Sequence, residues 1–333
     1  IYYFVYFKAQ TMIQQLLANA AVYGARIKGT AYPVYLFGSV GVGDVRASVI
    51  VSAAVAALFG LMWLLLSHSF LQIATATGKV ARREYREAHS RQRSINIALL
   101  CREFSHFAAS PSYMLNCGLG TFLMPVCAIA VLWKGSELFA VLDAIFAETP
   151  DSVPFLLCVM LCSLASMNFM TAPSVSLEGK SLWLLQSLPV EPWRIFQAKI
   201  RMQLFLTGLP LLLYIGCTAA VYPLHPMQMV MLLLLAGSYT LLMALVGLFF
   251  GVKMPTLTWT NEIMPIKQGG PVMITLFCGF GYMVLLFVGF MLLPGWILGF
   301  CRYIGCFVGA NLLLSVLIYM WLRKQGVARF SAL

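Results

Sequence analysis

The stretch TAPSVSLEGKSLWLLQSLPVEPWRIFQAKIRM, Thr171–Met202, separates two strongly apolar runs in the C-terminal part of the chain. It combines charged side chains with three prolines, a glycine and two tryptophans. The run on each side has about the 20 apolar residues that a helix needs to cross a bilayer. We therefore predict that this stretch is a polar loop between two membrane spans, and that the rest of the chain holds it at a membrane surface.

Composition supports a membrane protein. Apolar residues make up 61% of the 333 residues and charged residues 10%, against about 45–50% and about 25% in soluble domains. The mean hydropathy is +0.87. The sequence predicts an all-α polytopic membrane protein, with the lipid membrane as its surroundings.

Eight membrane segments are expected. Two lie in an N-terminal part, 1–74, at 1–23 and 48–74, with a loop over 24–47 that dips back toward the membrane. A basic segment, 75–112, follows. The remaining six spans form a transmembrane domain, 113–322, at about 113–135, 153–173, 203–222, 227–251, 271–293 and 295–322. A short tail, 323–333, ends the chain.

The second half of the basic segment, INIALLCREFSHFAASP, has apolar residues at helical spacing. Ile97, Leu100, Phe104 and Phe107 would share one face of a helix. Such a stripe is typical of a helix lying in the membrane interface. A cytosolic connector explains the pattern equally well, and both interpretations stay open.

The distribution of Lys and Arg predicts the orientation of the chain in the membrane. Sixteen of the 22 Lys and Arg residues lie in 75–112, 174–202, 252–270 and 323–333, which the predicted spans place on one side. Cytoplasmic loops carry the excess of Lys and Arg, so these segments, including the C-terminus, are predicted to be cytoplasmic. The same bias explains the net charge of +11, and we expect no nucleic-acid partner.

The predicted spans from 113 to 322 contain almost no ionisable group, and Asn311 is the lone strongly polar residue near a helix centre. Carriers driven by protons or cations hold such groups at mid-membrane, so an ion-coupled carrier is disfavoured. Neither HExxH nor GxSxG occurs, and no catalytic residue or metal site is predicted. Nine cysteines form no CxxC pair, and a disulfide between Cys301 and Cys306 is left open.

Gly179-Lys180-Ser181 resembles the end of a phosphate-binding P-loop. That motif needs a glycine five residues before its Gly-Lys pair, and Ser174 stands there. The chain is therefore not expected to bind ATP by this route.

Within the polar loop, a short element is expected to begin at Ser176, to stop at Leu188-Pro189, and to give way to a helix at Glu191-Pro192. Proline is tolerated in the first turn and an acid suits the helix N-terminus. The loop has two interpretations. It anchors the neighbouring helices through Trp183 and Trp193, or it docks on a cytosolic partner.

Three segments resemble bacterial ABC-2 type exporter permeases. The first matches a pattern of Ser-x-Glu-Gly-Lys, Trp, Ser-Leu-Pro and Lys, here Ser176, Glu178, Gly179, Lys180, Trp183, Ser187, Leu188, Pro189 and Lys199. The second, CREFSHFAASPSYMLN (Cys101–Asn116), is similar to the interfacial helix before the first span of such permeases. The third, PTLTWTNEIMPIKQGG (Pro255–Gly270), is similar to their later cytoplasmic loop, with matches at Trp259, Asn261, Glu262 and Lys267.

The resemblance covers about residues 95–325. It implies a six-helix transmembrane half preceded by an interfacial helix, in a bacterial cell membrane. Residues 1–74 would be the tail of a preceding half, as in the two-half permeases of Gram-positive bacteria. ATP and Mg would be bound by a separate pair of cytosolic ABC ATPase subunits, so that this chain is a transport subunit and not an enzyme.

The resemblance also implies roles for the loop residues. The ATPase-coupling loop would comprise Ser176, Leu177, Glu178, Gly179, Lys180, Trp183, Leu188 and Pro189, with Trp259, Asn261, Glu262 and Lys267 in a second cytoplasmic loop. Glu178 and Lys180 would make charged contacts with the partner, and Trp183 an apolar one. The apolar spans suit an amphipathic peptide or lipid-like cargo. The alternatives are a non-transporting membrane scaffold or regulator that binds a cytosolic partner, and an ion-coupled secondary carrier.

Overall fold

The computed structural model describes residues 24–25, 28–29, 32–74, 94–146, 151–292 and 299–333. These residues form helices and their connections, with one isolated antiparallel bridge between Gly118 and Asn168. The chain divides into two compact units, Ile1–Arg91 and Gln92–Leu333, which are treated separately below. The predicted segment 1–23, nearly all of the linker over 75–94 and the short connection at 293–296 lie outside the described residues.

Six of the described helices are long and apolar enough to cross a membrane. They are Val45–Phe70, Leu119–Ala144, Pro192–Val221, Pro226–Lys253, Gly270–Phe290 and Phe300–Ser331. A further apolar helix, α8 (Ser152–Ser166), is shorter. For the described residues, the predicted class is confirmed at this level: an all-α chain with several helices long and apolar enough to span a membrane.

In the first unit, α3 (Tyr32–Gly41) precedes the long apolar helix α4 (Val45–Ala74). The Asp44 carboxylate accepts a hydrogen bond from Arg46 N at 2.9 Å, which caps the start of α4. The prediction of a loop over 24–47 was therefore wrong for the residues in α3. The span predicted at 48–74 begins slightly earlier than expected, because the cap precedes the apolar run.

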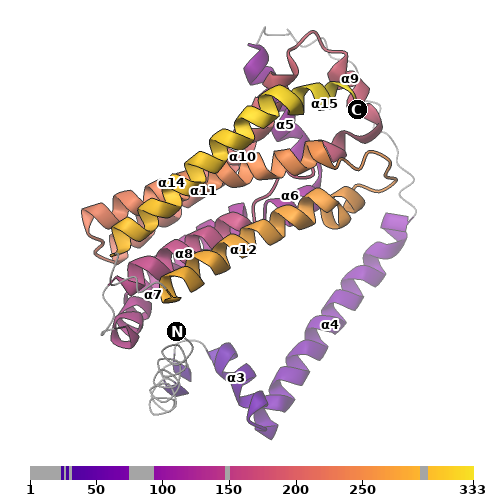
Figure 1. The fold of residues 1–333 in the computed structure, drawn as a ribbon. Helices are drawn as coiled ribbons and strands as arrows, with labels where there is room; N and C mark the ends of the chain where they lie inside the picture. Colours follow the sequence, from indigo (N-terminus) through magenta and orange to yellow (C-terminus); the bar gives the residue numbers. More distant parts are fainter. Residues whose placement is uncertain (1–23, 26–27, 30–31, 75–93, 147–150, 293–298) are drawn as a thin grey trace. The chain divides into compact units, whose positions relative to one another are not determined.

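The second unit is a helical bundle whose long helices run in roughly one direction or its reverse (Figure 1). Besides α8 its long helices are α7 (Leu119–Ile145), α10 (Pro192–Val221), α11 (Pro226–Lys253), α12 (Gly270–Leu292) and α14 (Phe300–Trp321). The most extensive packing joins α7 with α10 and α11 with α14. One apolar core fills the middle of the bundle, with Leu161, Tyr239, Met243, Leu286 and Ile304 among its fully buried members.

Local sequence explains where α10 and α11 begin. Pro192 occupies the first turn of α10 after Glu191, as predicted. At α11, the His225 ring accepts from Met227 N, and the Gln228 side chain accepts from His225 N at 3.0 Å. These reciprocal contacts form a capping box in which His takes the usual place of Ser or Thr. The link between α10 and α11 is short, so the two helices are antiparallel neighbours.

The helix predicted before the first span is present as α5 (Ile95–Ala109), and α6 (Pro111–Cys117) follows it. Ser110 caps α6, because its hydroxyl accepts from Tyr113 N. The predicted apolar stripe of α5 is only partly correct. Phe107 is buried, whereas Ile97 is 53% exposed and a carboxylate residue, Glu103, takes an inward position.

The span predicted at 153–173 is wrong at its C-terminal end. Helix α8 ends at Ser166, and the chain from Met167 to Val175 is irregular yet almost fully buried. Irregular backbone at membrane depth is tolerated where protein groups satisfy its N–H and C=O groups. Gln203 does this here, since its side chain accepts from Thr171 N at 2.8 Å and donates to Asn168 O at 2.9 Å.

Helix α11 approaches this irregular segment closely at Gly247. A Cβ at that position would lie 2.5 Å from Thr171 Oγ1 and 3.1 Å from Ala172 N. Only a residue without a side chain therefore allows the two backbones to pack at this distance.

We predict that Gly247→Ala lowers the stability of the protein by about 1–3 kcal/mol, as overpacking of a well-filled core does. The measurement is the thermal unfolding midpoint of the detergent-purified chain. Gly237→Ala on the same helix is the matched control, because a Cβ there meets nothing within 4 Å. Equal midpoints for the two variants would contradict the close approach.

Candidate functional site

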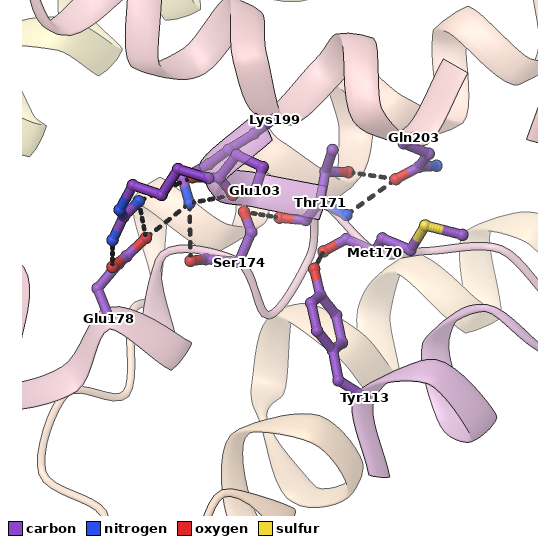
Figure 2. A network of polar contacts seen from close by, with 9 residues as sticks. Glu103, Tyr113, Met170, Thr171, Ser174, Glu178, Lys199 and Gln203 are labelled. Carbon is purple, nitrogen blue, oxygen red and sulfur yellow. Dashed lines mark hydrogen bonds and ion pairs between the residues drawn. The ribbon is translucent and has the colours of Figure 1, made fainter. Parts of the chain in front are cut away.

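A buried ion cluster joins the polar loop to two helices (Figure 2). The Lys199 ammonium, on α10, has no exposed surface. It lies 2.9 Å from Glu178 Oε1 and 3.0 Å from Glu103 Oε2, and it donates to Ser174 O at 3.2 Å. Three donors thus meet three acceptors, which fills the hydrogen-bonding capacity of the ammonium.

Arg102 completes the cluster from α5. Its Nη2 lies 2.6 Å from Glu178 Oε2 and its Nη1 lies 3.0 Å from Glu103 Oε1. Two cations therefore balance two carboxylates. The Arg102 side chain is 37% exposed, whereas those of Glu103 and Glu178 are 4% and 2% exposed. Arg102 is the member of the cluster that solvent reaches.

The electrostatic setting acts most clearly on Glu178. Burial alone would raise the pKa of its carboxyl, but Lys199 and Arg102 outweigh burial and lower the pKa to about 2. For Arg102, burial would lower the pKa, and the two carboxylates reverse that effect and raise it. Glu178 and Arg102 are therefore both charged at neutral pH.

Neutral hydrogen bonds extend the cluster into the bundle. Thr171 Oγ1 lies 2.8 Å from both Gln203 Oε1 and Ala244 O, which ties the segment before the loop to α10 and α11. Tyr113 Oη donates to Met170 O at 2.6 Å from the side of α6 (Figure 2). The loop is thus connected to four helices by buried polar contacts.

The loop itself contains a short 3₁₀ turn, η1 (Ser176–Ser181), followed by helix α9 (Leu182–Gln186). The element expected to begin at Ser176 is present, although α9 ends before Leu188. Gly179 has φ +50° and ψ −128°, a backbone conformation open essentially to glycine alone. Gly179 therefore makes a bend within η1, directly after Glu178.

The second predicted loop docks on the first. Trp259 Nε1 donates to Ser176 O at 2.6 Å, and Thr256 N donates to Ser176 Oγ at 3.0 Å. A Cβ at Gly179 would lie 3.0 Å from the Trp259 ring. The indole therefore lies directly against the bend.

The predicted residues of the first loop divide into two groups. Ser176, Leu177, Glu178 and Gly179 are buried. Trp183, Leu188 and Pro189 are exposed, Trp183 at 66%. The Lys180 side chain lies outside the described part of the chain. Glu178 was expected to contact a partner, but its carboxylate points inward and is engaged within the chain.

In the second loop, Trp259 is half-buried whereas Asn261, Glu262 and Lys267 are exposed. Glu262 accepts a hydrogen bond from Ser110 at 3.0 Å, so this loop also contacts the connection between α5 and α6. Lys267 lies on the π-helical turn η2 (Met264–Gln268), which leads into α12. The two loops and the start of α6 thus form one connected region.

The sequence analysis did not identify Arg102, Glu103 and Gln203 as members of this site. One signal was available for Glu103, because it lies four residues after Leu99 and four before Phe107, on what became the buried face of α5. An acid on the apolar side of a helix requires a cation opposite it. Lys199 offered that cation, but the distance in sequence concealed the pairing.

Comparisons with protein-family models, with curated proteins and with solved structures find no match to the chain. The interpretation of the site therefore depends on its own geometry and on the sequence motifs.

We predict that Lys199→Met destabilises the protein by about 3–5 kcal/mol, because it leaves two buried carboxylates facing one cation. Lys134→Met is the control, since that lysine is exposed and pairs with Glu137 at the surface. The double variant Glu178→Gln/Lys199→Met keeps the balanced pair of Arg102 and Glu103, and we expect it to unfold at a higher temperature than Lys199→Met alone. Strictly additive losses would show that the pairing has no energetic role.

The pKa of Glu178 also predicts a pH dependence. A carboxyl whose pKa is lower in the folded than in the unfolded state stabilises the fold above the unfolded value and loses this effect as the pH falls. The contribution of Glu178, at most about 3 kcal/mol, is thus lost between about pH 4.5 and about pH 2. Thermal midpoints measured across this window should fall steeply for wild type and less steeply for Glu178→Gln. The exposed control Glu137→Gln should keep the wild-type slope, and a shared slope for all three proteins would refute the assignment.

Proposed function

We propose that the chain is the membrane subunit of an ATP-driven exporter of the ABC-2 type. In this proposal a separate pair of cytosolic ABC ATPase subunits binds ATP and Mg and docks on the loop 176–189. The side of the bundle that carries this loop and the C-terminus faces the cytoplasm of a bacterial cell. The resemblance at Ser176–Pro189 motivates the class, and the construction of the loop supports it.

The observation that carries the proposal is the division of the loop into an anchored and an exposed part. Glu178 is fixed to α5 and α10 by buried ion pairs. A few residues later, Trp183, Leu184 and Leu188 are 66%, 54% and 39% exposed. Large apolar side chains, tryptophan above all, are typical anchors at protein interfaces. A segment that receives force needs an outer contact surface and a rigid inner attachment, and this loop has both.

The attachment defines a route for movement. A partner pressing on α9 would act through Gly179 on Glu178, and from Glu178 through the ion cluster on Lys199 of α10. Because α10 continues from the loop into a candidate membrane span without interruption, displacement at its start would tilt the span. Arg102 and Glu103 would carry the same displacement to α5, and Trp259 to the second loop.

The other functions considered from the sequence have less support. An ion-coupled carrier needs a titratable group that can bind its ion. Among the described residues, the buried charged side chains are Glu103, Glu178 and Lys199, and they neutralise one another together with Arg102. A scaffold or regulator would use the same exposed loop without turnover, and the assay below separates it from an exporter. The apolar spans suit an amphipathic peptide or lipid-like cargo.

We expect Trp183→Ala/Leu184→Ala to weaken assembly with the ATPase subunits at least about tenfold, because truncation of a central aromatic anchor commonly costs more than about 1.4 kcal/mol. Trp133→Ala, at an 80% exposed position on α7, is the control and should bind as wild type. The measurement is co-purification and stimulated ATP hydrolysis of the reconstituted complex. Wild-type assembly by the double variant would reject this docking surface.

Arg102→Gln separates docking from transmission in the same assay. It leaves α9 untouched and removes the half-exposed member of the ion cluster. Because the Arg102 side chain is 37% exposed whereas Lys199 is fully buried, water can replace it and the variant should stay folded. The exporter hypothesis then expects normal assembly with reduced substrate-dependent stimulation. A scaffold would assemble normally and show no substrate-dependent turnover even as wild type.

A further inference from the structure

Four cations lie on the elements at which α11 and α14 end, and two of them, Lys253 and Arg329, are in direct contact. Lys253 is the last residue of α11, Arg323 and Lys324 lie on the π-helical turn η3 (Leu322–Gly326), and Arg329 lies on α15 (Val327–Ser331). All four side chains are exposed. Lys253, Arg323, Lys324 and Arg329 are called the basic patch below.

Two members of the basic patch are held in place by the protein. Arg329 Nη2 donates to Lys253 O at 3.0 Å, so the guanidinium satisfies a backbone carbonyl at the C-terminus of α11 and keeps its other N–H groups. The Lys253 ammonium lies 5.4 Å from the centre of the Phe249 ring, within the range of a cation–π contact. Both cations are therefore partly ordered before any ligand arrives.

The turn that carries the patch is firmly docked. Phe330 and Leu322 are fully buried, and Phe330 packs edge-on against Phe196 of α10 with ring centres 5.2 Å apart. Phe330 O also accepts from Gln186 of α9 at 2.7 Å. The patch is thus part of the folded unit, and it adjoins the loop that contains α9.

The basic patch has no acidic partner within the part of the chain that the structure describes. None of the ion pairs found there includes one of its four cations. The helices α11 and α14, the turn η3 and α15 contain no Asp or Glu. On α10, which packs against α15, the nearest acid in sequence is Glu191 at the helix start, and Glu178 is consumed by the ion cluster.

The position of the patch indicates which anion it meets. It lies at the ends of two helices that are long and apolar enough to cross a membrane. Trp321 and Phe249, whose ring centres are 4.6 Å apart, lie beside the patch where the apolar part of these helices gives way to charge. Tryptophan at such a boundary is typical of the headgroup level of a bilayer, and clustered Lys and Arg at this level attract anionic lipids.

We propose that the basic patch binds the phosphate group of an anionic membrane phospholipid, with Arg329 and Lys253 as the contacts and with Arg323 and Lys324 adding positive charge from the preceding turn. Guanidinium and ammonium groups both form charge-assisted hydrogen bonds to phosphate oxygens. A bound lipid would hold α15 against α10 and so stabilise the neighbourhood of α9. The proposal requires that the helices span a membrane, and it does not depend on transport.

The test is lipid binding by the detergent-purified full chain, measured by native mass spectrometry with phosphatidylglycerol and phosphatidylcholine. We expect selective retention of phosphatidylglycerol by wild type and a decrease of about 10- to 30-fold in its affinity for Lys253→Gln/Arg329→Gln. Lys267→Gln/Arg302→Gln is the matched control, because it also removes one exposed lysine and one exposed arginine. Arg302 lies at the other end of α14.

Thermal unfolding is the second measurement, and it distinguishes loss of lipid binding from loss of the fold. Both double variants should still unfold cooperatively without lipid, and phosphatidylglycerol should raise the midpoint of wild type and the control only. Equal loss of binding in both variants would mean general charge attraction and would overturn the proposal. Equal binding of phosphatidylcholine, or displacement of the lipid by millimolar inorganic phosphate, would overturn it as well. Loss of ATPase stimulation with lipid binding intact would concern the proposed function alone.

Discussion

The ammonium group of Lys199 is the constraint on which the arrangement of the polar loop depends. A fully buried charge is tolerated only when opposite charge and hydrogen-bond acceptors surround it. Helix α10 cannot supply the opposite charge, because it contains no Asp or Glu. Glu178 and Ser174 must therefore come from the loop and Glu103 from α5. Two carboxylates around one ammonium leave an excess of negative charge, which Arg102 cancels from the solvent side.

This requirement explains why the chain leaves α8 early. A helix continued to residue 173 would carry Ser174 and Glu178 along its own axis and away from Lys199. The chain instead ends the helix at Ser166 and runs irregularly to η1, with Gln203 and Tyr113 satisfying the freed backbone groups. Gly247 gives the irregular segment room against α11. The buried charges and the neutral hydrogen bonds together allow non-helical backbone to pack inside an apolar bundle.

The parts of this arrangement that depend on local sequence could be predicted. The start of α10 at Pro192, the existence of α5 and the presence of the long apolar helices follow from prolines and runs of apolar residues. Their limits do not, because the span predicted at 113–135 is broken at Gly118 and its helix α7 continues to Ile145. The end of α8 could not be predicted from hydropathy, because Phe169, Met170 and Ala172 continue the apolar character and the partners of this segment are far away in sequence. Glu178 was expected at a surface for a similar reason. A glutamate beside glycine and lysine is normally solvated, and only the pairing with α5 and α10 places it inside.

The buried and the exposed part of the loop differ in which substitutions they tolerate, and this difference is relevant to the proposed exporter. A buried ion cluster contributes less net stability than an apolar core of equal volume, because each charge must first be desolvated. The cluster instead fixes the position of the loop. Its four charged groups satisfy one another in only one arrangement, whereas apolar side chains can shift past one another. A loop that only anchored helices would be served equally well by leucines. A loop that transmits displacement needs an attachment that does not slide, and the cluster of Arg102, Glu103, Glu178 and Lys199 supplies it. The exposed Trp183 takes no part in this attachment, so its side chain is available to contact a partner.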